Sequence, residues 1–173
     1  EAIVKAQELH QYDWEVRLLN LIGASFAIKS EYSLALEYYH KALEKATEEG
    51  CNTRLADTYN NLGGVQYVSS NYPEALANYL EALNYYEKDT VFDKIAGVHC
   101  NIGLLYFSLK NPEKSKSHFQ KALVGFKKLK IYSGQTLAML GNSRNYLAAS
   151  QYDSAFITID SAIDLSKSIH DIY

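Results

Sequence analysis

The feature that most constrains the fold is a spacing of 40 residues, at which side chains of one size class recur along the chain. An alanine ladder runs through Ala2, Ala42, Ala82, Ala122 and Ala162. A second ladder of small residues runs through Ala35, Ala75, Ser115 and Ala155. A third runs through Gly23, Gly63, Gly103 and Ser143, and a bulky one runs through Tyr39, Tyr79, Phe119 and Ile159. Ladders in one register predict a stack of similar supersecondary units, and such stacks usually act as binding surfaces.

Each unit is predicted to consist of two amphipathic helices joined by a tight turn. In residues 55–69, apolar side chains recur at three- and four-residue steps, which indicates a helix with one buried face. The segment SNYPEAL follows, and Pro73 stands where a second helix would begin, a position at which the missing N–H of proline is harmless. KNPEKSK repeats this turn with Pro112. The predicted unit is therefore helix, turn, helix.

The small residues are predicted to set how closely the helices approach. We expect Gly63 and Ala75 to meet where the two helices of one unit cross, and Ala82 to let the second helix approach the next unit. Tyr79 is expected to fill the space beside them. The residues predicted to have this structural role are Gly23, Ala35, Ala42, Gly63, Ala75, Ala82, Gly103, Ala122, Ala155 and Ala162.

These stretches resemble the tetratricopeptide repeat family. The matching segments are LLNLIGASF…YSLALEYYHKAL, TYNNLGGVQY…YPEALANYLEAL, VHCNIGLLYF…NPEKSKSHFQKAL and LGNSRNYL…YDSAFITIDSAI. The last match is weaker, because Ser143 replaces the glycine and Asn142 replaces the apolar residue before it. The resemblance implies an all-α fold, a right-handed α-solenoid of antiparallel helix pairs. The usual period of the family is about 34 residues, so the chain resembles a long-period type.

Both ends of the sequence are predicted to lie inside a unit, because EAIVKAQELHQYDWEVRLLNLIG aligns without a gap on KALEKATEEGCNTRLADTYNNLG. This interpretation makes the chain a fragment of a longer array. The predicted segments are residues 1–15 (second helix and loop of a preceding repeat), 16–55 (repeat one), 56–95 (repeat two), 96–135 (repeat three) and 136–173 (repeat four, degenerate).

In this family the first helices line a concave groove that usually holds a peptide. The resemblance therefore implies the peptide-binding residues Arg17, Asn20, Asp57, Asn60, Tyr67, Cys100, Leu104, Phe107, Leu140 and Arg144.

For several of these residues a structural role competes with the binding role. Asn20 and Asn60 recur at the same place and could clamp a peptide backbone, or they could simply solvate a helix surface. Arg17 and Arg144 could anchor a ligand carboxylate or could be surface charges. Tyr67, Leu104 and Phe107 could be ligand contacts or core between neighbouring first helices.

Composition disfavours several other classes of function. The net charge is −3, which argues against nucleic acid as a partner, because nucleic-acid-binding domains usually carry a basic face. Seven lysines between Lys110 and Lys130 form either a solvated helix face or a contact for an acidic partner or lipid. No catalytic motif, phosphate-binding loop or metal-ligand spacing is present in the sequence, and Cys51 and Cys100 are expected to be free thiols. We therefore expect no enzyme activity, no cofactor and no metal, and the sequence contains no segment apolar enough to span a membrane.

The predicted function is a scaffold that binds a protein or peptide through the concave groove, without catalysis. Two alternatives remain at this point. One is a ligand- or partner-sensing region of a larger bacterial signalling protein, such as a sensor kinase or transcription regulator, and the other is a self-association module that forms homo-oligomers. The partner stays unidentified, and the compartment stays open, with the cytoplasm favoured.

Overall fold

The chain is all-helical in the part that the structure describes. The computed structural model describes the backbone of residues 2–170 and the side chains of residues 13–48 and 50–167. The side chain of Ala2, the first residue of the alanine ladder, lies outside the described residues. So do the side chains of residues 1–12 in predicted segment 1–15 and of residues 168–173 in predicted segment 136–173. In chain order the described helices are α1 (Ala2–Ile28), α2 (Tyr32–Glu49), α3 (Asn52–Val68), α4 (Tyr72–Lys88), α5 (Phe92–Ser108), α6 (Pro112–Lys128), α7 (Tyr132–Ala148) and α8 (Tyr152–His170).

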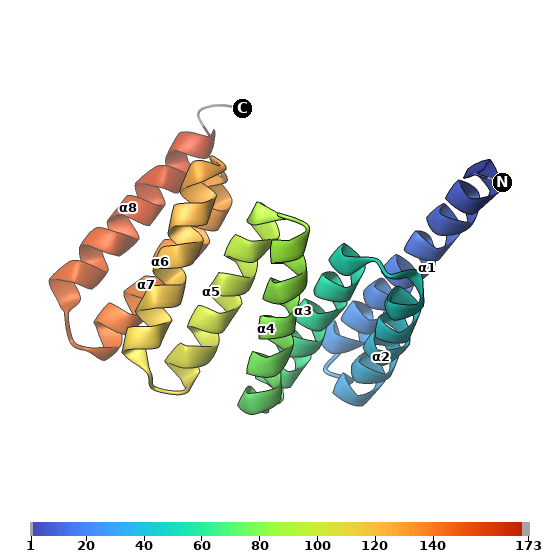
Figure 1. The fold of residues 1–173 in the computed structure, drawn as a ribbon. Coiled ribbons are helices and arrows are strands. Elements are labelled where there is room, and N and C mark those ends of the chain that lie inside the picture. The colour runs from blue at the N-terminus through green and yellow to red at the C-terminus, as the bar shows by residue number, and fades with distance from the viewer. Residues whose placement is uncertain (1, 171–173) are drawn as a thin grey trace. The chain divides into compact units, whose positions relative to one another are not determined.

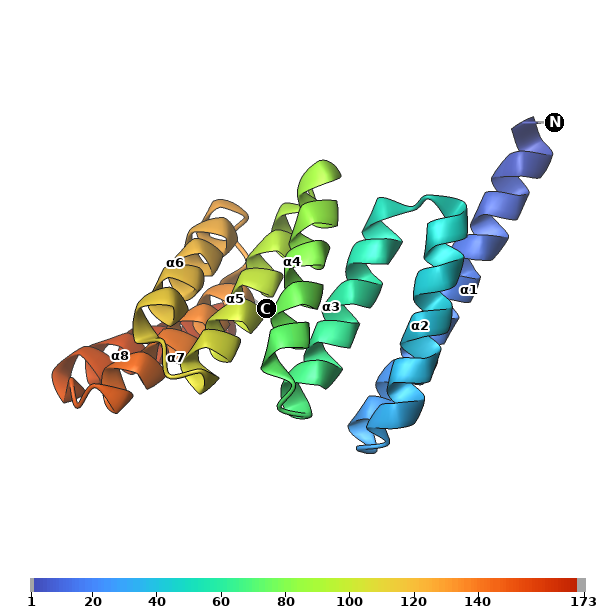
Figure 2. The ribbon, with the colours of Figure 1, turned by 60° about the horizontal axis from the view of Figure 1, so that its bottom comes forward.

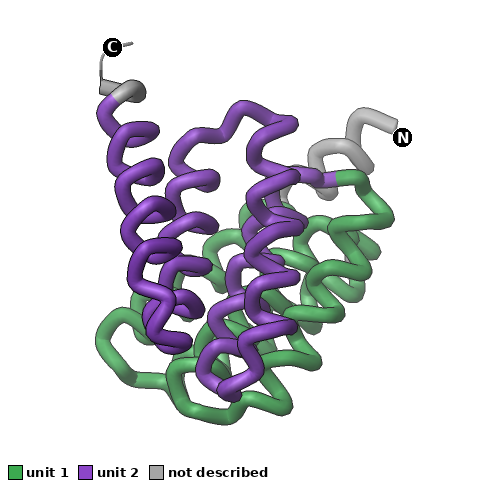
Figure 3. The backbone as a smooth tube through the Cα atoms, turned by 90° about the vertical axis from the view of Figure 1, so that its left-hand side faces the viewer, with its two compact units in different colours: residues 1–90 green, residues 91–173 purple. Residues whose placement is uncertain are grey.

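The helices pack as antiparallel pairs, which confirms the predicted all-α fold class. The pairs are α1 with α2, α3 with α4, α5 with α6 and α7 with α8 (Figure 1), and Figure 2 shows their members running side by side. They form two compact units, Glu1–Thr90 and Val91–Tyr173, coloured separately in Figure 3. Within the first unit α3 contacts both α1 and α2, and within the second α7 contacts both α5 and α6. Each unit therefore buries its helices by stacking one pair on the next.

The same short turn joins the helices throughout both units. One or two residues past the helix end, the backbone adopts a left-handed conformation, with φ between 55° and 66°, at Ser30, Gly50, Ser70, Thr90, Lys110, Lys130 and Ser150. At most of these turns the next backbone N–H bonds to a carbonyl five residues earlier, as Asn71 N does to Gln66 O at 2.8 Å. This hydrogen bond satisfies a carbonyl that the end of the helix leaves free. Because the turn needs so few residues, each second helix folds straight back along its first.

The glycine ladder faces the aromatic ladder inside each pair. A Cβ atom built on Gly23 would lie 2.6 Å from the Tyr39 ring, and one on Gly63 would lie 2.6 Å from the Tyr79 ring. The three atoms nearest to the Cβ built on Gly63 all belong to Tyr79, so the ring fills the space that the missing side chain leaves. The expected contact between Gly63 and Ala75 stays a prediction. Tyr79 is 3% exposed, and burial raises the pKa of its phenol.

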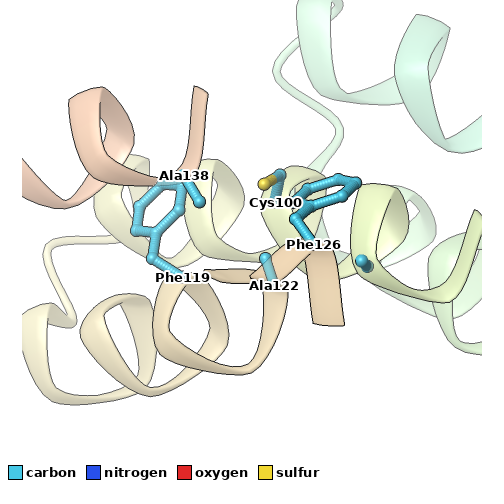
Figure 4. Close-up of a cluster of buried hydrophobic side chains, with 6 residues drawn as sticks. Cys100, Phe119, Ala122, Phe126 and Ala138 are labelled. Carbon is cyan, nitrogen blue, oxygen red and sulfur yellow. The ribbon is translucent and has the colours of Figure 1, made fainter. Parts of the chain in front are cut away.

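Two rings of α6 continue this packing in the second unit. Phe119 lies 3.0 Å from a Cβ built on Gly103 and 2.2 Å from one built on Gly141. Phe126 lies 2.5 Å from a Cβ built on Gly134. Glycines on both α5 and α7 therefore make room for α6. Figure 4 shows the cluster that results: Ala96, Cys100, Phe119, Ala122, Phe126 and Ala138.

The fourth pair keeps the register but changes both partners of the glycine–aromatic contact. Ser143 stands where the other first helices have glycine, and its hydroxyl donates to the Leu140 carbonyl at 2.8 Å. Ile159 stands where the other second helices carry a ring. A larger residue on one helix thus accompanies a smaller one on the other. The alanines of the small-residue ladders are buried in both units, at 0–1% exposure.

Two adjacent glycines of α3 allow a direct test of this packing. Alanine is a better helix former than glycine by about 1 kcal/mol, so both substitutions gain equally in propensity. Gly63→Ala should nevertheless lower the free energy of unfolding, because overpacking against the buried Tyr79 ring costs about 1–3 kcal/mol. Gly64→Ala should raise it by about 0.5–1 kcal/mol, since a Cβ at Gly64 meets nothing within 4 Å. Urea unfolding of both variants measures the difference, and equal effects at the two positions would contradict the packing.

Candidate functional site

An apolar stripe with one cation at its centre is exposed along α7. Its residues are Leu137, Leu140, Arg144 and Leu147. The spacing of three, four and three places them on one face of the helix. The three leucines are 55%, 42% and 47% exposed, and Arg144 is exposed as well. Grouped exposed leucines are typical of a surface that binds a partner, whereas single ones are ordinary.

Helix α5 lies beside this stripe and contributes partly buried apolar residues. Phe107 and Leu104 are half-buried, and Leu104 packs on the core cluster of the unit. Both residues therefore combine a core contact with some remaining exposure.

Cys100 is buried, although the resemblance implied that it would line the groove. It is 1% exposed within the cluster of Phe119 and Phe126, and burial raises the pKa of its thiol to about 12. Its side chain is therefore part of the buried core of the second unit.

Two predicted groove residues on α1 are engaged by other residues of the first unit. Arg17 Nε lies 2.9 Å from Asp13 Oδ2, and its guanidinium stands 5.4 Å from the centre of the Trp14 ring. Asn20 Nδ2 donates to Thr58 Oγ1 at 2.9 Å, and Asn20 Oδ1 accepts from Asn61 Nδ2 at 2.9 Å. The Asn20 amide thus braces α1 against α3.

A charged network that the sequence analysis missed crosses the same unit. Arg54 bonds to Asp13, and its Nη1 lies 2.9 Å from Asp57 Oδ2. The Tyr86 hydroxyl donates to Asp57 Oδ1 at 2.5 Å. The hydrogen bond from Arg54 lowers the pKa of Asp13 despite its partial burial. Burial by itself would lower the pKa of Arg54, but the two aspartates raise it. This network joins α1, α3 and α4, so Asp57 has a structural role.

The remaining predicted residues of the first unit lie on α3. Asn60 and Tyr67 are half-buried there. The Tyr67 ring packs at a tilt on the Tyr72 ring, with 5.8 Å between their centres.

Two histidines meet across the third helix pair, although they are 19 positions apart in the sequence. His99 Nδ1 on α5 lies 3.1 Å from His118 Nδ1 on α6. One ring must donate and the other accept, so the accepting ring must be neutral and the pair cannot carry a proton on all four ring nitrogens. Burial, His118 and Lys121 lower the pKa of His99 to about 4. Burial, together with Lys121 and Lys114, also lowers the pKa of His118.

This pair predicts that acid weakens the fold. A histidine whose pKa is lower in the folded than in the unfolded state binds protons preferentially when unfolded, so stability is lost as pH falls below about 6.5. After discounting for solvent screening, the loss attributable to His99 between pH 7 and pH 5 should be about 1 kcal/mol. Urea unfolding of the wild type and of His99→Gln across this range measures it. The substituted chain should lose less stability than the wild type, and parallel pH profiles would contradict the assignment.

Other chemistry finds little support in the described residues. No three histidine, cysteine, aspartate or glutamate side chains gather as metal ligands in that part of the chain. None of the helices there has the length and apolar character of a membrane span. Part of the predicted lysine stripe is packed on aromatic faces: Lys114 Nζ lies 5.1 Å from the Tyr106 ring centre and Lys116 Nζ lies 5.0 Å from that of Tyr146.

Comparison with known proteins places the repeats in a family. Models of the tetratricopeptide repeat match residues 14–88 and residues 96–123. The chain therefore carries tetratricopeptide repeats, units that bind proteins and peptides. No curated protein matches the sequence.

Solved structures with the same arrangement of helices share little sequence with this chain. BtubC (BKLC) from P. vanneervenii aligns at a TM-score of 0.80 and 20% identity, over 92% of this chain and 66% of that one. A Rap protein complexed with competence and sporulation factor aligns at 0.82 and 18%, over 95% and 45%. A signal transduction ATPase with a tetratricopeptide repeat sensor, from Pyrococcus horikoshii, aligns at 0.81 and 19%, over 93% and 25%.

These similarities confirm the fold, a tetratricopeptide-like solenoid of antiparallel helix pairs. The chain spans just under two thirds of BtubC and less than half of the other two proteins.

Proposed function

We propose that the chain binds a peptide segment of a partner protein on the first-helix face of its second unit, and that it does so without catalysis. The observation that carries this proposal is the α7 stripe, in which three exposed leucines flank Arg144. Arg144 makes no ion pair with the residues that the structure describes, so its guanidinium is available to a ligand carboxylate. The complementary ligand has apolar side chains on either side of an acidic group.

The first unit supports the proposal less strongly. Its predicted contacts Arg17, Asn20 and Asp57 already bond to Asp13, Thr58 and Arg54, respectively. A ligand there would have to replace those bonds. We therefore assign the stronger binding role to α7 and its neighbour α5. We also propose that the repeats are of a long-period type, since α3, α5 and α7 begin at Asn52, Phe92 and Tyr132.

A display library of random twelve-residue peptides, selected on the 173-residue chain, tests the binding face. Selected peptides should be rich in leucine-like and acidic residues. The double variant Leu140→Ser/Arg144→Glu should bind them at least about tenfold more weakly, equivalent to about 1.4 kcal/mol. Isothermal titration calorimetry measures the affinities, and circular dichroism checks that the variant stays helical.

Leu80→Ser is the matched control for this experiment. Leu80 is 50% exposed, close to the value for Leu140, but it lies on the second helix α4. The control should bind the peptides as the wild type does. If the double variant binds as tightly as the wild type, or if the control loses as much affinity as the double variant, the binding site does not lie on α7.

A second candidate function is a ligand-sensing region of a larger signalling protein. The printed descriptions of two structural neighbours favour it: one is a Rap protein complexed with competence and sporulation factor, and the other contains a tetratricopeptide repeat sensor. Both candidates use the same binding face and differ in what else the protein contains. The complete coding sequence distinguishes them, because a kinase, ATPase or DNA-binding domain supports a sensor and further repeats alone support a scaffold.

A further inference from the structure

A cavity of about 570 Å³ opens in the second unit where α5 and α7 end. Its walls are largely apolar and include Phe107, Pro112, Ala148 and Ala149. Asn145 also lines it, and this residue follows Arg144 of the exposed stripe in sequence. Ala148, which also lines the cavity, lies one turn beyond Arg144 on the same face of α7, so the cavity adjoins the proposed peptide-binding face.

Asn145 is a polar exception at a position that the two preceding repeats fill with aliphatic side chains. The equivalent residues one and two repeats earlier are Leu105 and Val65, which are 0% and 3% exposed. Asn145 is 1% exposed, and its Oδ1 atom has no hydrogen-bond partner. Burying an unpaired carbonyl oxygen is unfavourable, and an aliphatic residue at this position would avoid it.

A chain of hydrogen bonds fixes the orientation of this amide. Ser115 Oγ lies 2.8 Å from the Gly103 carbonyl oxygen, which can only accept, so the serine uses its one proton there. Ser115 can then only accept from Asn145, whose Nδ2 lies 2.9 Å away. Exchange of the amide oxygen and nitrogen would break this bond. The Asn145 oxygen is thus left unpaired by the packing of α5, α6 and α7.

We propose that the cavity is a pocket for a tyrosine side chain of the bound peptide, with the phenol O–H donating to Asn145 Oδ1. The ring would pack against Phe107 and Pro112, and the two alanines leave room for it. Oδ1 is covered in the structure without a ligand, so in the proposed complex the amide tilts enough to meet the phenol while Nδ2 keeps its bond to Ser115 Oγ. This inference rests on the proposed peptide-binding function and specifies one side chain of the ligand.

Binding of p-cresol, which reproduces the tyrosine side chain, to the full chain tests the pocket. Calorimetry should give one saturable site, with p-cresol bound at least about fivefold more tightly than 4-fluorotoluene, which has a similar shape and no O–H donor. Asn145→Leu introduces the aliphatic type of residue that the two preceding repeats have and removes the acceptor. It should unfold at higher urea concentration than the wild type and lose p-cresol binding at least tenfold. Ala148→Leu, which narrows the cavity and keeps Asn145, should also weaken binding.

Asn142→Leu is the matched control. Asn142 lies one turn earlier on α7, also carries an unpaired buried Oδ1, and stands where the earlier repeats have Ile102 and Leu62. It does not line the cavity. Its substitution should stabilise the chain and leave the affinity for p-cresol within about twofold of the wild type.

Three results would overturn the pocket: no saturable p-cresol binding by the wild type, undiminished binding by Asn145→Leu, or an equal loss in Asn142→Leu. The two proposals can fail separately. If p-cresol does not bind but selected peptides still require Leu140 and Arg144, the pocket is wrong and the peptide-binding function stands. If p-cresol binds as described but no peptide depends on those residues, the pocket stands as a site for phenolic ligands and the peptide function is wrong.

Discussion

The rest of the structure depends on one contact, in which a large side chain of the second helix packs directly against the backbone of the first helix. Tyr39 and Tyr79 leave no space for a side chain at Gly23 and Gly63, and Phe119 similarly crowds both Gly103 and Gly141. Protein interiors are densely packed, so a ring must fill the volume that a glycine leaves empty. Equally, a glycine is needed where a ring occupies the space of a side chain. This complementarity sets the approach of the two helices in each pair, and the short left-handed turns bring them together.

The same packing explains why binding residues can collect on the first helices. Helices α5, α6 and α8 all pack against α7, and the side that they leave exposed carries Leu137, Leu140, Arg144 and Leu147. In the first unit the corresponding polar residues bond to one another, through the Asp13–Arg54–Asp57 network and the Asn20–Thr58 bond. The two units therefore share a fold and differ in how the polar side chains of their first helices are engaged.

Much of the fold could be predicted from the sequence, because residues with the same packing role recur at the same position in each repeat. The all-helical pairs, the turns beside Pro73 and Pro112 and the burial of the alanine ladders all follow from that repetition. Contacts made once could not be predicted in this way. The His99–His118 contact and the Arg54 network join residues on different helices with no recurring partner to reveal them.

The candidate site was predictable as a face, but the state of each residue on it was not. Leu140 and Arg144 are exposed, whereas the thiol of Cys100 is buried at the equivalent position on α5. A one-residue difference in where a side chain points decides between core and groove, and helical periodicity alone cannot resolve it. Asn142 was visible as a departure from the apolar pattern, whereas the sequence analysis did not single out Asn145. Only the structure shows that both leave an oxygen unpaired.

The most direct test of the central claim is a double-mutant cycle that gives the second pair the combination found in the fourth. Gly63→Ser and Tyr79→Ile are made singly and together, and the free energy of unfolding is measured in urea. If ring and glycine are coupled as described, each single change is destabilising and the double variant is more stable than their sum by at least about 1 kcal/mol. Additive effects would show that the two positions pack independently, and the account of how the helix pairs are held together would be wrong.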